Sequence, residues 1–141
     1  MPQEINIYTS TTPREFVRQK LTEGYTPFGL LTGSLGKAID ISLIKLERGE
    51  ITLESVKKLI RFEGQVMRIL IPDFNLVQLE DLLNAYSSTP EDERRIERMI
   101  SGNKLTGENV LKYISDRRRK KFRGLKSDIP FANEFAQDIP I

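Results

Sequence analysis

The chain has 141 residues, a mass of 16.2 kDa and a formal net charge of +2, and it contains no histidine, cysteine or tryptophan. This composition excludes catalysis by an imidazole or a thiolate, a zinc site built from cysteine and histidine, and a disulfide scaffold. The length favours one domain, and 38% hydrophobic with 30% charged residues is typical of a globular chain rather than a disordered one.

The sequence contains no apolar run near the roughly 20 residues of a transmembrane helix. Its first ten residues also lack the basic start and apolar stretch of a secretory signal. We therefore expect a cytoplasmic protein. The carboxylates occur in helix first turns or on solvated faces, so we expect no enzymatic activity, no metal, no cofactor and no small-molecule substrate.

Short local signals mark the first elements of the chain. The alternation of apolar and polar residues from Glu4 to Tyr8 predicts a short strand. Thr12 can cap a helix that starts with Pro13, and Gly24 can end it. Residues 24–36 contain four glycines and predict a flexible surface loop.

Within this loop, residues 29–37 resemble a phosphate-binding loop only superficially. Ala38 follows Gly36-Lys37 where a P-loop requires serine or threonine for magnesium, and the glycine spacing is wrong as well. We therefore expect no nucleotide binding by this loop.

Two interpretations remain open for residues 38–63. Ile39, Ile41 and Leu43 alternate as in a strand, so residues 46–51 would be a hairpin loop. In the alternative, which we favour, a first helix ends at Gly49 and Thr52 caps a second one.

The second half of the chain predicts helices with one further strand. The apolar run Val66–Ile71 is short and lies between a glycine and a proline, which favours a buried strand. Helices are expected to start at Asn75, Pro90 and Thr106. The expected fold class is therefore α+β: a helix-rich single domain with a small antiparallel sheet.

Charge is distributed unevenly along the chain. Residues 90–126 carry 12 basic and 6 acidic side chains, whereas residues 127–141 carry three acids and no base. Such asymmetry indicates an interaction surface and a tail with a different role. We expect one globular domain over residues 1–126 and an acidic-aromatic C-terminal tail over residues 127–141.

The basic run near the end of the domain is the principal candidate site. Its members, all expected to bind a partner, are Arg117, Arg118, Arg119, Lys120, Lys121, Phe122 and Arg123. Arginine forms bidentate hydrogen bonds with carboxylates and phosphates, so the run suits nucleic acid or an acidic protein surface. The alternative is a solvated helix end that the helix dipole favours. On the binding hypothesis, changing Arg117, Arg118 and Arg119 to glutamate abolishes partner binding and leaves the melting temperature nearly unchanged.

The tail is the second candidate site. Phe131 and Phe135 would share one face of a helical turn, among the acids Asp128, Glu134 and Asp138. Acidic-hydrophobic segments of this kind dock into grooves, either of a partner or of their own domain. Both interpretations remain open, and we include the two phenylalanines among the candidate partner-binding residues.

In general make-up the chain resembles small bacteriophage-encoded regulators that bind host RNA polymerase. The resemblance rests on the compact size, the basic helix ending at residues 117–123 and the acidic-aromatic tail at residues 128–138. It implies a non-enzymatic protein that docks on RNA polymerase or its sigma factor and alters transcription. The alternatives are direct nucleic-acid binding through the basic helix 107–123 and a structural subunit of a phage or multi-protein assembly.

Overall fold

The computed structural model describes residues 11–123, and over this range the protein is all-α with no strand. This finding corrects the expected α+β class. The strand predicted at residues 4–8 lies outside the described residues, as does the boundary expected between residues 126 and 127.

The strand predicted at Val66–Ile71 is wrong, because most of it belongs to helix α4 (Leu53–Leu70). Within that stretch Val66, Met67 and Leu70 are buried while Arg68 is exposed, which is helical rather than alternating spacing. A glycine inside a helix costs about 1 kcal/mol but does not stop it when the flanking stripe packs in a core. Only at Ile71 does the chain change to a short 3-10 turn (Ile71–Asp73).

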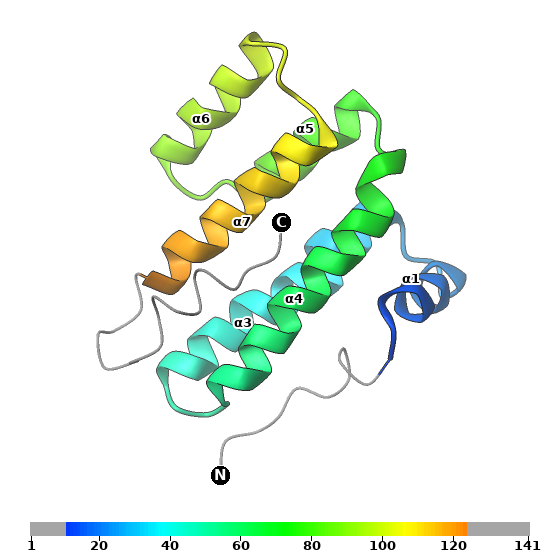
Figure 1. The fold of residues 1–141 in the computed structure, drawn as a ribbon, viewed down its shortest axis with the longest axis vertical. Helices are drawn as coiled ribbons and strands as arrows, with labels where there is room; N and C mark the ends of the chain where they lie inside the picture. Colours follow the sequence, from blue (N-terminus) through cyan, green and yellow to red (C-terminus); the bar gives the residue numbers. More distant parts are fainter. Residues whose placement is uncertain (1–10, 124–141) are drawn as a thin grey trace.

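The two-helix interpretation of residues 38–63 is confirmed. Helix α3 (Gly36–Glu47) packs against α4, as Figure 1 shows. Gly49 leaves the first helix with a φ of +74°, a conformation that glycine adopts without strain. The Thr52 hydroxyl then accepts the amide of Ser55 at 3.1 Å and caps α4.

The expected surface loop at residues 24–36 is also wrong, because most of it is helical. A single turn, α2 (Pro27–Gly29), leads into a π-helical turn (Leu30–Leu35) that continues directly into α3. Leu30, Leu31 and Leu35 are fully buried, so this glycine-rich stretch is held by the core. The π turn places the Gly36 amide on the Leu31 carbonyl.

Helix α1 (Pro13–Thr22) begins and ends as its sequence predicts. The Thr12 hydroxyl accepts the amide of Glu15 at 3.2 Å, and Gly24 follows the helix with a φ of +103°. The helix packs against α4, where the rings of Phe16 and Phe62 meet edge to face with centroids 5.1 Å apart.

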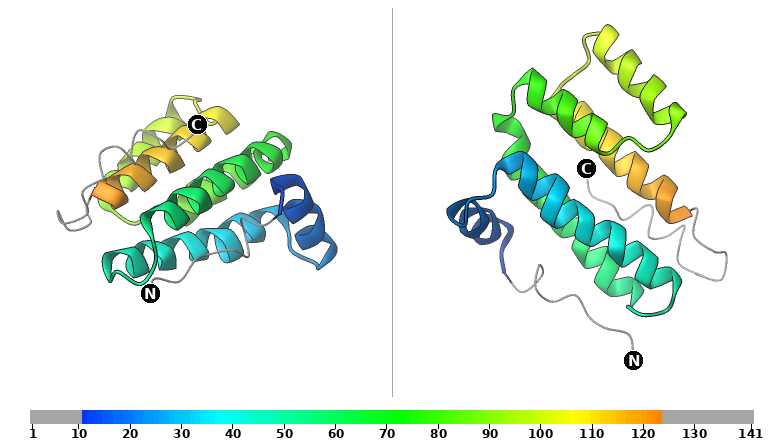
Figure 2. Two further views of the ribbon diagram at one scale, coloured as in Figure 1. Left: turned by 60° about the horizontal axis from the view of Figure 1, so that its bottom comes forward. Right: turned by 180° about the vertical axis from the view of Figure 1, so that it is seen from behind.

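Three further helices complete the described part: α5 (Leu76–Ala85), α6 (Pro90–Ser101) and α7 (Gly107–Arg123). Figure 2 shows α4 between α3 and α7, and its view from behind shows α5 in front of α7 with α6 next to it. Buried side chains from α1, α3, α4, α5, α6 and α7 form one hydrophobic cluster. None of these helices is both long enough and apolar enough to span a bilayer.

Candidate functional site

Arg118, in the middle of the basic run, points into the protein. Its side chain is 1% exposed. Nε and Nη2 donate to the two carboxylate oxygens of Glu63 on α4, at 3.2 and 2.9 Å. Nη1 donates to Oδ1 of Asp40 on α3 at 2.7 Å. This bidentate pair plus a second carboxylate satisfies a buried guanidinium and connects α3, α4 and α7.

Tyr86, just after α5, closes this ion cluster. Its hydroxyl lies 3.1 Å from the Leu31 carbonyl and 3.2 Å from Oε2 of Glu63, and the Arg118 guanidinium carbon is 5.2 Å from its ring centroid. Burial, reinforced by the charge of Glu63, raises the pKa of the Tyr86 phenol well above its usual value. The phenol therefore stays protonated and can donate.

The same surroundings keep Arg118 charged. Burial on its own lowers the pKa of its guanidinium, but Glu63 and Asp40 outweigh burial and raise it. Arg118 is therefore a buried ion-pair partner, and the expectation that it binds a partner at the surface is corrected. The apolar periodicity of α7 indicates this inward position, since Arg118 follows the buried Val110 and Ile114 at intervals of four residues.

Glu63 and Asp40 were not predicted from the sequence, because only carboxylates close to one another along the chain were considered as candidates. Glu63 stands on the buried stripe of α4, between Ile60 and Met67. An acid on such a stripe requires a buried cation, which is the signal that could have found it. Its partner lies 55 residues away, and local patterns say nothing about that pairing.

Three other members of the run, Arg119, Lys120 and Lys121, form ion pairs within the protein. Arg119 lies 3.0 Å from Asp116, whose other oxygen accepts Arg95 of α6 at 2.8 Å. Lys120 reaches Glu91 at 3.1 Å, and Lys121 reaches Asp40 at 3.0 Å. The side chains of Phe122, Arg123, Phe131 and Phe135 lie outside the described residues.

These contacts correct the expected effect of the triple glutamate variant. Glutamate at position 118 would stand beside Glu63 and Asp40, so the variant would lose fold stability along with any binding. A test of the surface must therefore leave Arg118 intact.

A hollow of about 290 Å³ lies where α7 passes the start of α6. It is lined by Ser88, Thr89, Glu91, Asp92, Arg117, Lys120 and Lys121. The Arg117 guanidinium lies 5.7 Å from the Tyr86 ring centroid, and its Nε and Nη1 are buried without a hydrogen bond to the described part of the chain.

Asp92 keeps negative charge in this hollow. Burial on its own raises the pKa of its carboxyl, but the Ser88 amide, the Thr89 hydroxyl and the charge of Arg117 outweigh burial and lower it. The hollow therefore combines cations with fixed acids. Residues 11–123 contain no group of three or more acids placed to hold a metal ion.

The ion cluster predicts a dependence of stability on acid. Burial raises the pKa of Asp40, but Arg118 and Lys121 outweigh it and hold the pKa below the usual 3.8. Ionised Asp40 therefore stabilises the fold above pH 3.8, and this contribution is lost as the pH falls through the lowered value. We expect Asp40→Asn to flatten the acid limb of the stability curve, measured by urea denaturation between pH 2 and 7. Asp81→Asn, at an exposed site on α5, is the control, and equal curves for Asp40→Asn and the unaltered chain would contradict the assignment.

Comparison of the chain with protein-family models, with curated proteins and with solved structures finds no significant match, so the fold and the contacts above carry the functional argument alone.

Proposed function

We propose that this chain is a non-enzymatic, cytoplasmic binding protein that regulates a nucleic-acid machine by docking on one of its protein components. RNA polymerase or its sigma factor is the component that the resemblance to small phage regulators implies. The docking surface is the end of α7, where Arg117, Lys120 and Lys121 line one hollow.

The observation that carries the proposal is how the two lysines are held. Lys120 and Lys121 are exposed, and each is paired with a carboxylate on another helix, at Glu91 of α6 and Asp40 of α3. Exposed ion pairs are worth about 0–1 kcal/mol, so acidic groups of a partner can replace them at little cost. The pairs hold the cations in place before binding, which favours orientation and association rate.

The mixed charge of the hollow favours a protein partner over nucleic acid. Glu91 and Asp92 line it beside the three cations. A phosphate backbone presents unbroken negative charge and would be repelled by both acids, whereas a protein surface can offer acidic and basic groups in register. Direct nucleic-acid binding by residues 107–123 is therefore the second candidate.

We expect Lys120→Glu with Lys121→Glu to weaken binding to purified bacterial RNA polymerase holoenzyme about tenfold or more, which is about 1.4 kcal/mol. The unaltered chain should bind more weakly as salt rises, and the variant should show less of this dependence. Arg14→Glu with Arg18→Glu is the matched control, because these exposed cations lie one turn apart on α1. Biolayer interferometry gives the affinities, and circular dichroism checks that the folds are equal.

Three outcomes would contradict the proposal. If the lysine variant and the Arg14/Arg18 control variant bind the polymerase with equal affinity, the α7 surface takes no part in the interaction. Binding to bare DNA or RNA in a gel shift, lost in the lysine variant alone, would support the nucleic-acid alternative. Self-assembly of the purified chain without polymerase binding would support a structural subunit.

A further inference from the structure

A groove runs between α4 and α7, and we define this α4–α7 groove by Ile60, Gly64 and Arg68 on one side and Leu111, Ile114 and Ser115 on the other. Where α4 ends and α7 begins, the groove widens into a hollow of about 400 Å³ beside Gly107 and Ile71. Its floor reaches the buried Arg118. Below this hollow the space between the helices is only about 10 Å³, so the groove is shallow and an occupant would lie over it rather than fill it. Its lining is mainly apolar, and its deepest part lies against the ion cluster.

Gly64 leaves room for another segment to lie directly on α4. It lies inside an 18-residue helix, where glycine costs about 1 kcal/mol relative to alanine. Its φ is not positive, so no backbone conformation at this position requires glycine. A glycine whose missing Cβ faces a groove allows a side chain or backbone to lie directly on the helix.

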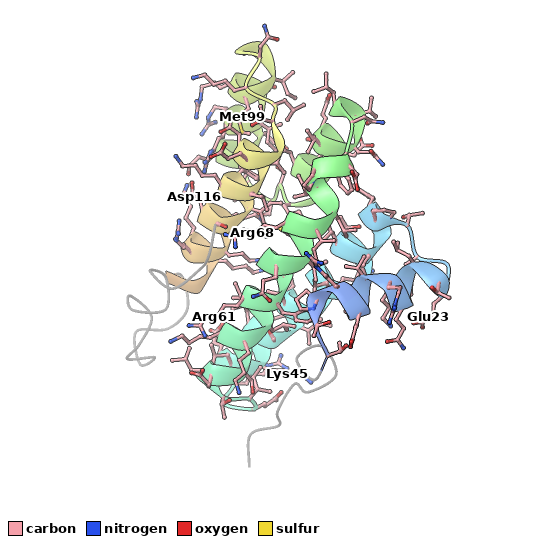
Figure 3. The ribbon with its side chains drawn as sticks, turned by 45° about the vertical axis from the view of Figure 1, so that its right-hand side comes forward. Glu23, Lys45, Arg61, Arg68, Met99 and Asp116 are labelled. Atoms are coloured by element: carbon pink, nitrogen blue, oxygen red, sulfur yellow. The ribbon has the colours of Figure 1, made fainter. Side chains whose placement is uncertain are left out.

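The rim of the groove on α4 is basic. Lys57, Arg61 and Arg68 follow one another at intervals of four and seven residues, so they share one side of the helix. Figure 3 shows Arg61 and Arg68 on the side of α4 that faces α7. An occupant of this groove should therefore combine acids with large apolar side chains.

Residues 127–141 of the same chain have this composition. They carry Asp128, Glu134 and Asp138 with no base, and Phe131 and Phe135 four residues apart. No other stretch of comparable length combines an excess of acids, two phenylalanines and a complete absence of cations. Charge complementarity with the basic rim thus identifies the occupant.

The length of this segment fits the groove. Helix α7 has 17 residues and spans about 25 Å at 1.5 Å per residue, from the hollow beside Gly107 to its end at Arg123. The eighteen residues 124–141 could cover more than twice that length when extended, at about 3.3 Å per residue. They can therefore turn back at the end of α7 and follow the whole groove.

We propose that residues 127–141 bind in the α4–α7 groove of their own chain. Phe131 and Phe135 lie over Gly64, and Glu134 and Asp138 pair with Arg61 and Arg68. This binding does not rest on the proposed function, since α7 lines the groove with Leu111, Ile114 and Ser115 and lines the docking hollow with Arg117, Lys120 and Lys121. It makes the two phenylalanines ligands of the domain rather than of a foreign partner.

The absence of cysteine makes a direct test simple, because one introduced cysteine is a unique attachment point. A nitroxide spin label on Ala136→Cys in the full ¹⁵N-labelled chain should broaden the amide signals of Gly64, Arg68 and Leu111. Reducing the label with ascorbate should restore them. The amides of Arg94 and Arg98 on α6, a helix that does not line the groove, serve as the reference.

Charge exchange tests the pairing. Arg61→Glu with Arg68→Glu should remove most of the broadening, and adding Glu134→Arg with Asp138→Arg should restore it. Arg94→Glu with Arg98→Glu, two exposed cations one turn apart on α6, is the matched control and should leave the broadening unchanged.

Mixing an unlabelled ¹⁵N chain with a spin-labelled ¹⁴N chain shows whether the tail comes from the same molecule. Absence of broadening in this mixture supports the proposal. Broadening that occurs only between molecules, that falls on another face, or that is absent from the groove altogether overturns it.

Discussion

Replacing Arg118 by methionine is expected to lower the free energy of unfolding by about 3–5 kcal/mol, the largest effect of any single substitution considered for this protein. Methionine has a similar length but no charge, so Glu63, which is 2% exposed, would be left buried without its cation. The phenol of Tyr86 alone cannot compensate an isolated carboxylate. Urea denaturation followed by circular dichroism at pH 7 measures the change.

A second substitution separates the ion pair from the shape of the side chain. Adding Glu63→Leu to Arg118→Met removes both buried charges, and the double variant is expected to recover most of the lost stability. Lys120→Met, an exposed site on the same helix, is the control and should change the stability by less than about 0.5 kcal/mol. A loss below about 1 kcal/mol for Arg118→Met would show that Glu63 finds another partner.

Replacing Gly36 by alanine is expected to cost about 1–3 kcal/mol, although alanine is the better helix former. A Cβ at this position would lie 2.6 Å from the Leu31 carbonyl oxygen and 3.1 Å from the Tyr86 hydroxyl. That carbonyl is held in place, because it accepts both the Gly36 amide in the π turn and the Tyr86 hydroxyl. The backbone must therefore shift to admit one methyl group.

Gly33 provides the matched control for this prediction. It lies in the same π turn, but a Cβ there would meet nothing within 4 Å. We expect Gly33→Ala to be neutral or to stabilise the protein by up to about 1 kcal/mol, since alanine loses less backbone entropy on folding. Equal thermal denaturation midpoints for the two variants would contradict the close approach at Gly36.

Local interactions explain which elements sequence analysis found. Thr12, Thr52 and Thr89 each cap a helix by accepting an amide three residues ahead, and Gly24 and Gly49 end helices with positive φ. These contacts act within a single turn, so they can be predicted without knowledge of the tertiary fold.

The errors arose where packing overrides local preference. Glycine content predicted a loop at residues 24–36, but the burial of Leu30, Leu31 and Leu35 makes most of it helical. The short apolar run at residues 66–71 has the composition of a buried strand, and only its position on the stripe of α4 makes it helical. Intrinsic propensity is a weak prior when a segment contributes to the core.

In the candidate site, too, local sequence predicts some features and tertiary packing decides others, here for individual charged side chains. The amino-acid sequence predicts that a basic helix ends the domain and that an acidic segment follows it, because composition and periodicity are properties of neighbouring residues. It does not reveal that Arg118 turns inward while Lys120 and Lys121 stay outside. That choice was made by the packing of α7 against α3 and α4, which brings Asp40 and Glu63 to the same guanidinium from 78 and 55 residues away. A buried charge is tolerated only beside its counter-charges, and those are brought together by the tertiary fold.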